Sequence, residues 1–106
     1  MVSLRQFDVF PNPSPRTRAE NPYFVVLQSD RLERFATRIV APLITPAKIQ
    51  FLEHLLPEVV VEGEPYVIAI PDLGPIPAKM LQPAVANLEA ERYNILGAID
   101  MLFTGA

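Results

Sequence analysis

Twelve prolines in 106 residues limit the folds that this chain can adopt. Each proline fixes φ at about −65°, removes a backbone donor and disfavours helical geometry at the preceding residue. Only two proline-free stretches exceed ten residues, 23–41 and 84–106. A helical bundle and a doubly wound α/β fold both need several long, uninterrupted helices, so the prolines exclude both.

Short aromatic and β-branched segments stand between the prolines, which is typical of strands. The segments that predict strands are 6–10, 23–29, 37–43, 58–62 and 65–70, with 76–81 as a further candidate. Gly63 lies between two of these segments and predicts a hairpin turn. Pro42 lacks the N–H that a strand ladder needs, so it places its strand at a sheet edge or at a strand end.

The segments between the predicted strands are rich in turn-forming residues. Residues 11–22, 30–36 and 71–75 predict loops and turns. Residues 44–57 contain five large apolar residues after Pro46. They fit a short amphipathic helical turn, because such side chains need burial, and they equally fit a mobile loop.

The last part of the chain changes to a helical period. On a helix, six apolar residues of 88–103 fall within an arc of about 120° and predict a core-facing stripe: Leu88, Ile95, Leu96, Ile99, Leu102 and Phe103. Arg92 lies inside this arc, so we expect its stem to follow the core edge and its head to pair with a carboxylate or carbonyl. Asn87 fits the N-cap and Gly105 the C-terminal stop. The residues predicted to face solvent are Glu89, Tyr93, Asp100 and Thr104.

These elements predict one domain over residues 1–106. The strands fall within 6–81 and the helix spans about 88–104. The fold class is mainly β with one C-terminal α-helix. Short strands with proline-rich connections favour a small antiparallel, SH3-like barrel of about five strands.

The residues that most enzymes need for chemistry are scarce. There is no cysteine, His54 is the only histidine, and none of the three serines lies in a Gly-x-Ser-x-Gly context. No glycine-rich phosphate loop and no histidine motif for a metal occurs. We therefore expect no catalytic residues, no metal and no cofactor.

Charge is unevenly distributed along the chain. The net charge is −3, with +2 over residues 1–38 and −5 over residues 39–106. The overall acidity argues against a general nucleic-acid binder. Five arginines leave a local basic patch open, although a solvated surface is the more common role of such residues: Arg16, Arg18, Arg31, Arg34 and Arg38. No apolar run approaches a membrane span and no signal peptide is visible, so we expect a cytoplasmic protein without a membrane partner.

Several short motifs occur together in a characteristic order. They are Gln6-Phe7-x-Val9, Phe24-Val25 followed by Gln28-Ser29-Asp30, Val40-x-Pro42-Leu43, Val85-Ala86-Asn87-Leu88, and the run from Ala98 to Gly105. In this order and at this length the chain resembles CcdB-type toxins, the gyrase-poisoning half of a toxin–antitoxin pair. The resemblance covers nearly the whole chain, from Gln6 to Ala106.

The resemblance implies a homodimer of barrel-like subunits, a fold shared with the Kid and MazF toxins. Members of the family are not enzymes. They trap DNA gyrase on cleaved DNA by binding its GyrA subunit, and a CcdA-like antitoxin removes them. The toxin–antitoxin complex represses its own operon, so the toxin meets that DNA only indirectly, through the complex.

The resemblance also implies roles for individual residues. The gyrase-binding residues would be Arg31, Leu32, Asp100, Thr104, Gly105 and Ala106. The family usually ends in Trp-Gly-Ile, has Asn where this chain has Asp100, and has an apolar pair at 31–32. The antitoxin-binding residues would be Ile44, Thr45, Lys48 and Phe51. The dimer interface would include Met101 and Phe103, whose other reading is core packing.

Two alternatives remain open. In the first alternative, the chain is a non-poisoning relative that keeps only dimerisation and antitoxin binding. Thr104 motivates it, because it stands at the position of the family's tryptophan. Alternatively it is a ribonuclease toxin of the same fold superfamily, with roles for Arg16, Arg18, Thr37 and Arg38. For Asp100, Thr104, Gly105 and Ala106 the plain alternative is a solvated helix end with a frayed terminus.

Overall fold

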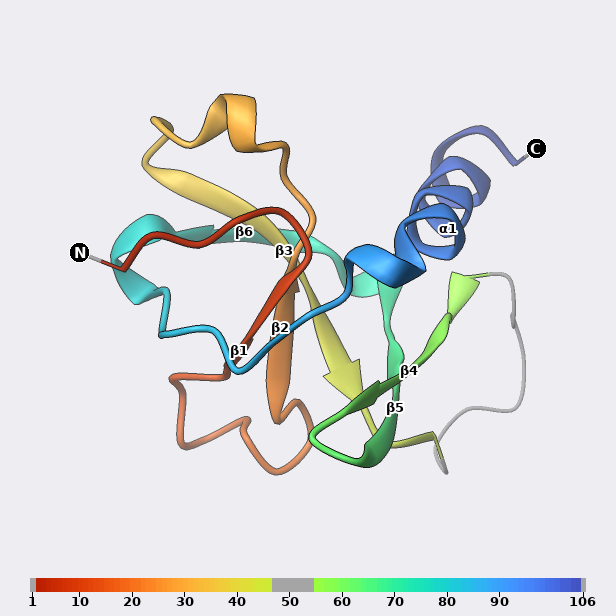
Figure 1. The fold of residues 1–106 in the computed structure, drawn as a ribbon, viewed down its shortest axis with the longest axis horizontal. Helices are drawn as coiled ribbons and strands as arrows, with labels where there is room; N and C mark the ends of the chain where they lie inside the picture. The colour runs from red at the N-terminus through yellow and green to blue at the C-terminus, as the bar shows by residue number, and fades with distance from the viewer. Residues whose placement is uncertain (1, 47–54, 106) are drawn as a thin grey trace.

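The computed structural model describes residues 2–46 and 55–105. Its strands are β1 (Asp8–Pro11), β2 (Tyr23–Val26), β3 (Thr37–Ile44), β4 (Glu58–Val61), β5 (Glu64–Ile68), β6 (Gly74–Pro77) and β7 (Ala86–Asn87). Short 3₁₀ turns are η1 (Asp30–Leu32), η4 (Ile70–Asp72), η5 (Ala78–Met80) and η6 (Glu89–Glu91), and the chain ends in α1 (Arg92–Thr104) (Figure 1).

The strands form one antiparallel sheet with the order β4-β5-β3-β2-β1-β7, and β6 pairs with the other part of β3. The sheet curls into a nearly closed barrel whose path ends at β4 on one side and β7 on the other. The predicted fold class, mainly β with a small barrel and one C-terminal helix, is confirmed. The two-residue strand β7 has no counterpart among the predicted strands.

The β4–β5 hairpin follows the sequence prediction. Glu62 and Gly63 form its two-residue turn, with φ of 51° and 81°. Two successive positive φ values define the turn type whose twist matches a hairpin, and glycine adopts such a φ without strain. Pro65 lies opposite Val60, a position at which the ladder needs no N–H from proline.

The prediction for Pro42 is wrong, because β3 is a central strand. It pairs with β2 along one edge and with β6 and then β5 along the other. The carbonyl of Pro42 accepts a hydrogen bond from Ala69 N–H at 2.9 Å. Its nitrogen therefore faces the same edge, where β3 changes partner and no ladder donor is needed.

Several predicted boundaries shift. The candidate strand at 76–81 is β6 over Gly74–Pro77 followed by η5, so β6 begins inside the predicted turn 71–75. The first strand begins at Asp8 because Phe7 has φ of 70°, which interrupts extended backbone. The α-helix begins at Arg92, after the 3₁₀ turn η6.

Asn87 is not the N-cap of α1. Its side-chain oxygen accepts the N–H of Glu89 at 2.8 Å and so stabilises the start of η6. Asn87 thus stabilises the start of a helical turn as predicted, but that turn is η6 and not α1, because the chain enters α1 through a 3₁₀ turn.

The helix packs on the main core through Ile95 and Ala98, and Leu88 is buried beside them. Leu96, Ile99 and Leu102 are partly buried against the same cluster. Phe103 does not share this burial, since its side chain is 69% exposed. Ala98 lies in the packed face, which shifts the centre of that face away from Phe103.

Candidate functional site

The C-terminal end of α1 presents a polar tip with a fixed backbone. Asp100 and Thr104 are exposed, as predicted for the solvent-facing stripe. The hydroxyl of Thr104 donates to the carbonyl of Asp100 at 2.7 Å. Gly105 has φ of 71°, and its N–H donates to the carbonyl of Met101 at 3.0 Å. This left-handed cap ends the helix at a defined point. Ala106 lies outside the described residues.

The turn η1 holds Arg31 and Leu32, the other predicted gyrase-binding residues. The side chain of Gln28 closes it, donating to Leu32 O at 2.9 Å and accepting Ile39 N–H at 3.1 Å. The hydroxyl of Ser29 accepts the N–H of Arg31 at 3.1 Å. These bonds keep Arg31 and Leu32 exposed on a defined turn. Serine before a 3₁₀ turn is a local signal that the sequence carries.

Gln6 connects η1 with the start of α1. Its backbone N–H donates to Asp30 Oδ1 at 2.7 Å, and its side-chain amide donates to Leu27 O at 3.0 Å. On the other side, its Oε1 accepts a bond from Arg92 Nη1 at 3.5 Å and its carbonyl accepts one from Asn87 at 3.4 Å. One residue thus joins elements that lie far apart in the sequence.

Arg92 behaves as predicted. Its Nη1 lies 3.7 Å from a carboxylate oxygen of Glu89, and its guanidinium lies 5.5 Å from the centroid of the Phe7 ring. The buried ring and the partly exposed cation form a cation–π contact at the core edge. A hollow of about 460 Å³ is lined by both residues of the ion pair, together with Arg5, Gln6, Asp30 and Asn87.

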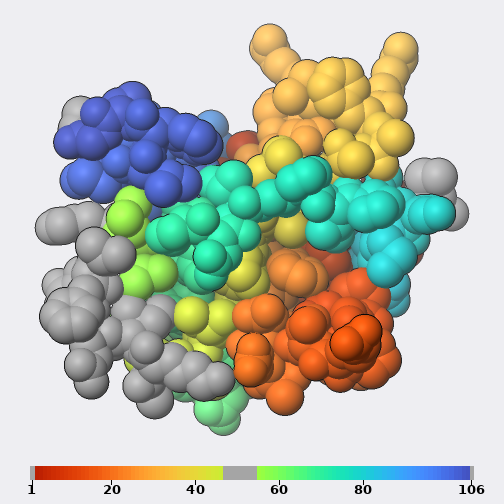
Figure 2. Space-filling view, turned by 180° about the vertical axis from the view of Figure 1, so that it is seen from behind, coloured from red at the N-terminus to blue at the C-terminus, as the bar shows by residue number. Residues whose placement is uncertain are grey.

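The two parts of the predicted gyrase surface lie on either side of a notch. Figure 2 shows this notch between α1, in blue, and the segment 30–38, in light orange and yellow, with the β5–β6 connection between them. Exposed apolar side chains occur on both segments, Leu32 and Phe35 on 30–38 and Phe103 on α1. Met101 is half-buried. The fold thus places opposite one another two segments that are about seventy residues apart.

The predicted antitoxin residues lie elsewhere. Ile44 is the last residue of β3, half-buried and paired with Val67, and Thr45 follows it in an exposed position. The eight-residue strand β3 separates them from the segment 30–36 (Figure 1). Lys48 and Phe51 lie outside the described residues.

The five arginines proposed for a basic patch are divided between two separate parts of the structure. The loop 11–22 and the segment 30–38 lie at opposite ends of the molecule (Figures 1 and 2). Arg18 donates to the carbonyl of Asn12 at 2.9 Å, and Arg38 donates to the carbonyls of Glu33, Phe35 and Thr37. Both guanidinium groups thus stabilise their own loops. The set proposed for ribonuclease chemistry is divided in the same way.

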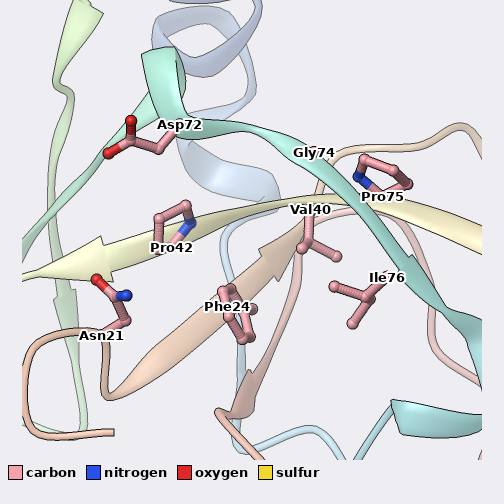
Figure 3. Close-up of a pocket in the computed structure, with 8 residues that line it drawn as sticks. All are labelled: Asn21, Phe24, Val40, Pro42, Asp72, Gly74, Pro75 and Ile76. Atoms are coloured by element: carbon pink, nitrogen blue, oxygen red, sulfur yellow. The ribbon is translucent and has the colours of Figure 1, made fainter. Parts of the chain in front are cut away.

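A pocket of about 300 Å³ opens where β3 changes partner (Figure 3). Its apolar part comes from β2, β3 and β6, with Phe24, Val40 and Ile76 among the residues that line it. Its two polar side chains, Asn21 and Asp72, lie at one end (Figure 3). The pocket is therefore a mainly apolar hollow with one amide and one carboxylate at its end, which suits binding more than catalysis.

In residues 2–46 and 55–105, no group of three or more histidine, aspartate or glutamate side chains is placed to hold a metal ion. Within the same ranges, no helix has the length and apolar character that crossing a bilayer requires.

The family model described as CcdB protein matches residues 6–105. The chain belongs to the CcdB family. No curated protein matches it significantly. The family match spans both sides of the notch and confirms the resemblance seen in the sequence. The protein is therefore a CcdB-type toxin of a toxin–antitoxin system.

Proposed function

We propose that this CcdB-type toxin poisons DNA gyrase by binding the GyrA subunit with the surface formed by the α1 tip and η1. It acts in the cytoplasm and by binding rather than by catalysis. The observations that support the proposal most directly are the exposure of Asp100, Thr104 and Gly105 at the end of α1 and of Arg31 and Leu32 on η1. These two elements belong to the segments that Figure 2 shows on either side of the notch. The resemblance to the family assigns the gyrase contact to these positions.

The proposal includes a homodimer. A monomer leaves Phe103 69% exposed and Phe35 59% exposed on the two sides of the notch. Exposed large aromatic side chains of this kind are typical of protein–protein contacts. A second copy that covers the last turns of α1 would contact Phe103 and Met101 and would bring two α1 tips into one surface.

Neutralisation by an antitoxin completes the proposal. A CcdA-like antitoxin binds at the end of β3, with Ile44, Thr45, Lys48 and Phe51 as contacts, and the resulting complex represses the operon. The net charge of −3 supports DNA contact through the antitoxin rather than through the toxin itself.

A cleavage assay with purified components tests the gyrase step. Gyrase from the protein's own host, DNA and ATP are incubated with the toxin, and the cleaved complex is quantified. The unmodified protein is expected to accumulate cleaved DNA. Asp100→Arg is expected to reduce this at least about tenfold, because a reversed charge at a docking tip costs binding energy. Tyr93→Ala is the matched control on the exposed face near the start of α1.

A growth assay separates poisoning from mere family membership. The gene is induced in a host that lacks the antitoxin, and Thr104→Trp is compared with the unmodified protein. We expect both to arrest growth, the variant at lower induction, because an aromatic anchor adds about 2 kcal/mol and so roughly thirtyfold in affinity.

Two results would reject gyrase poisoning by the natural protein. Arrest by Thr104→Trp alone identifies a relative that keeps dimerisation and antitoxin binding but does not poison. Arrest accompanied by cleavage of a test RNA, and lost in Arg38→Ala, identifies the ribonuclease alternative.

A further inference from the structure

The outer edge of β4 carries unpaired backbone groups. Pro57 O accepts Ile68 N–H at 2.9 Å, so Pro57 faces β5. Alternate residues of a strand direct their N–H and C=O to the same edge. Val59 and Val61 therefore face β5 as well, while Glu58 and Val60 point their backbone groups away from it. Within the described residues β4 pairs only with β5, so this edge offers two donors and two acceptors.

This edge borders a groove at the seam of the barrel, which is the place between β4 and β7 where the sheet does not close. The groove has a volume of about 470 Å³ and lies between β4 and the β7–η6 segment. Glu58 and Val60 line it on one side, and Leu88 and Glu91 line it on the other. The Val60 side chain is 65% exposed, although it belongs to a strand. The seam therefore combines backbone hydrogen-bonding groups with exposed apolar surface.

The charge of the groove is one-sided. Glu58 and Glu91 contribute carboxylates, and among the described residues no lysine or arginine lines it. Two copies of β4 paired edge to edge would gather the Glu58 and Glu91 carboxylates of both copies along one groove, which disfavours pairing of the chain with itself. A partner with positive charge meets no such repulsion.

The other free edges of the sheet are blocked. Pro75 and Pro77 of β6 lie opposite Ile39 and Thr37, and their nitrogens offer no N–H to an added strand. The strand β7 has only two residues. Of the sheet edges in residues 2–46 and 55–105, β4 is thus the one that can accept a strand of several residues.

We propose that this groove binds an extended, basic peptide segment of another protein, which adds to β4 as a further strand. Main-chain hydrogen bonds to Glu58 and Val60 hold the segment. Its basic side chains reach Glu58 and Glu91, and an apolar side chain packs on Val60. The proposal does not depend on gyrase binding, so each can fail without the other.

Peptide binding to the full chain tests the proposal. The probe is the hexapeptide acetyl-Lys-Val-Lys-Val-Lys-Val-amide, titrated into ¹⁵N-labelled protein with amide hydrogen exchange as the readout. We expect saturable binding and exchange slowed about tenfold or more at the amides of Glu58 and Val60. A peptide with glutamate in place of lysine, and one with N-methylated backbone amides, are expected not to bind.

Variants of the edge sharpen the test. Val60→Pro removes an outward N–H that β5 does not use and is expected to weaken binding about tenfold, whereas Val60→Thr keeps it. Glu58→Gln with Glu91→Gln is expected to weaken binding several-fold at low salt and little at high salt, and it leaves the backbone unchanged.

Three results would overturn the proposal. The first is no saturable binding of the hexapeptide. The second is binding without slower exchange at Glu58 and Val60. The third is exchange at both amides that is already slow in the free protein and becomes slower as the protein concentration rises. That result would mean that a second copy already covers the edge.

Discussion

At the scale of single residues, Asn12 organises the β1–β2 loop. Its side chain is only 1% exposed and donates to Thr17 Oγ1 and to Asn21 O, both at 2.9 Å. Its Oδ1 accepts the N–H of Ser14 at 2.9 Å. The four prolines of residues 11–22 disfavour regular secondary structure there. The three hydrogen bonds of one buried amide hold the loop in its conformation instead.

Asn12→Ala is therefore expected to lower the free energy of unfolding by about 2 kcal/mol, because buried partners lose their hydrogen bonds. Urea denaturation followed by circular dichroism measures the change. Ser14→Ala is the matched control, since the bond to Asn12 uses the Ser14 backbone, and it should stay within about 0.5 kcal/mol. Equal losses in both variants would contradict this role for Asn12.

Tyr23 makes stability depend on alkaline pH. Burial, then the Glu62 carboxylate and then Tyr66, raises the pKa of the Tyr23 phenol above its ordinary value of 10.0. Between the unfolded and folded pKa values the native state holds more protons, so stability is fully present below about pH 10 and falls as pH rises above it. Tyr23→Phe removes the ionisable group and keeps the ring.

We expect the loss of stability between about pH 9 and pH 11 to be smaller in Tyr23→Phe than in the parent. Urea midpoints at the two pH values provide the measurement. Tyr93, which is 87% exposed, is common to both proteins and serves as an internal control. The same fall in both proteins would show that Tyr23 does not contribute.

Single residues differ in how much the sequence predicts about them. Gly63 and Arg92 were predictable because a turn type and a helical arc each follow from local spacing. The burial of Asn12 was not, since its partners depend on the path that the whole loop takes. The positive φ of Phe7, a bulky residue in the core, has no local signal either.

At the scale of elements, α1 and its C-terminal cap contain two glycines with opposite consequences. Gly97 lies in the middle of the helix, and an added Cβ there meets nothing within 4 Å. Gly97→Ala is expected to raise the free energy of unfolding by about 0.5–1 kcal/mol. Gly105→Ala is expected to lower it by about 1 kcal/mol, because its φ of 71° strains a residue with a Cβ. Thermal unfolding of both variants checks the opposite signs.

The details of the elements show which features a sequence pattern cannot predict. The type and order of the main elements follow from proline spacing and from the change of period at the C-terminus. The placement of Pro42 in a central strand does not, because it depends on β3 exchanging β6 for β5 at that point. Tertiary pairing decides such positions.

At the scale of the whole molecule, self-association is expected to depend on the α1 side of the notch. Phe103→Glu places a charge on the exposed apolar surface and should convert a dimer into a monomer of 11.8 kDa. Tyr93→Glu changes a side chain that is 87% exposed on the first turn of the same helix and should leave the dimer intact. Light scattering after gel filtration measures both masses. A parent protein that is already monomeric would reject the dimer.

The prediction of the candidate site depended on the family resemblance more than the prediction of the fold did. Periodicity predicts that Asp100 and Thr104 face solvent, but nothing local relates them to Arg31 and Leu32. Those two segments are brought opposite one another only by the closure of the barrel. The sequence therefore predicts each side of the notch separately, and only the three-dimensional structure joins them.

The hydrogen bonds of Gln6 have a consequence for how the molecule opens. Its side chain and backbone join Leu27 and Asp30 on one side to Asn87 and Arg92 on the other. Neither η1 nor the start of α1 can separate from the barrel without breaking bonds to this one residue. We therefore expect η1 and the start of α1 to open together, and a partner bound to one of them to restrain the fluctuations of the other.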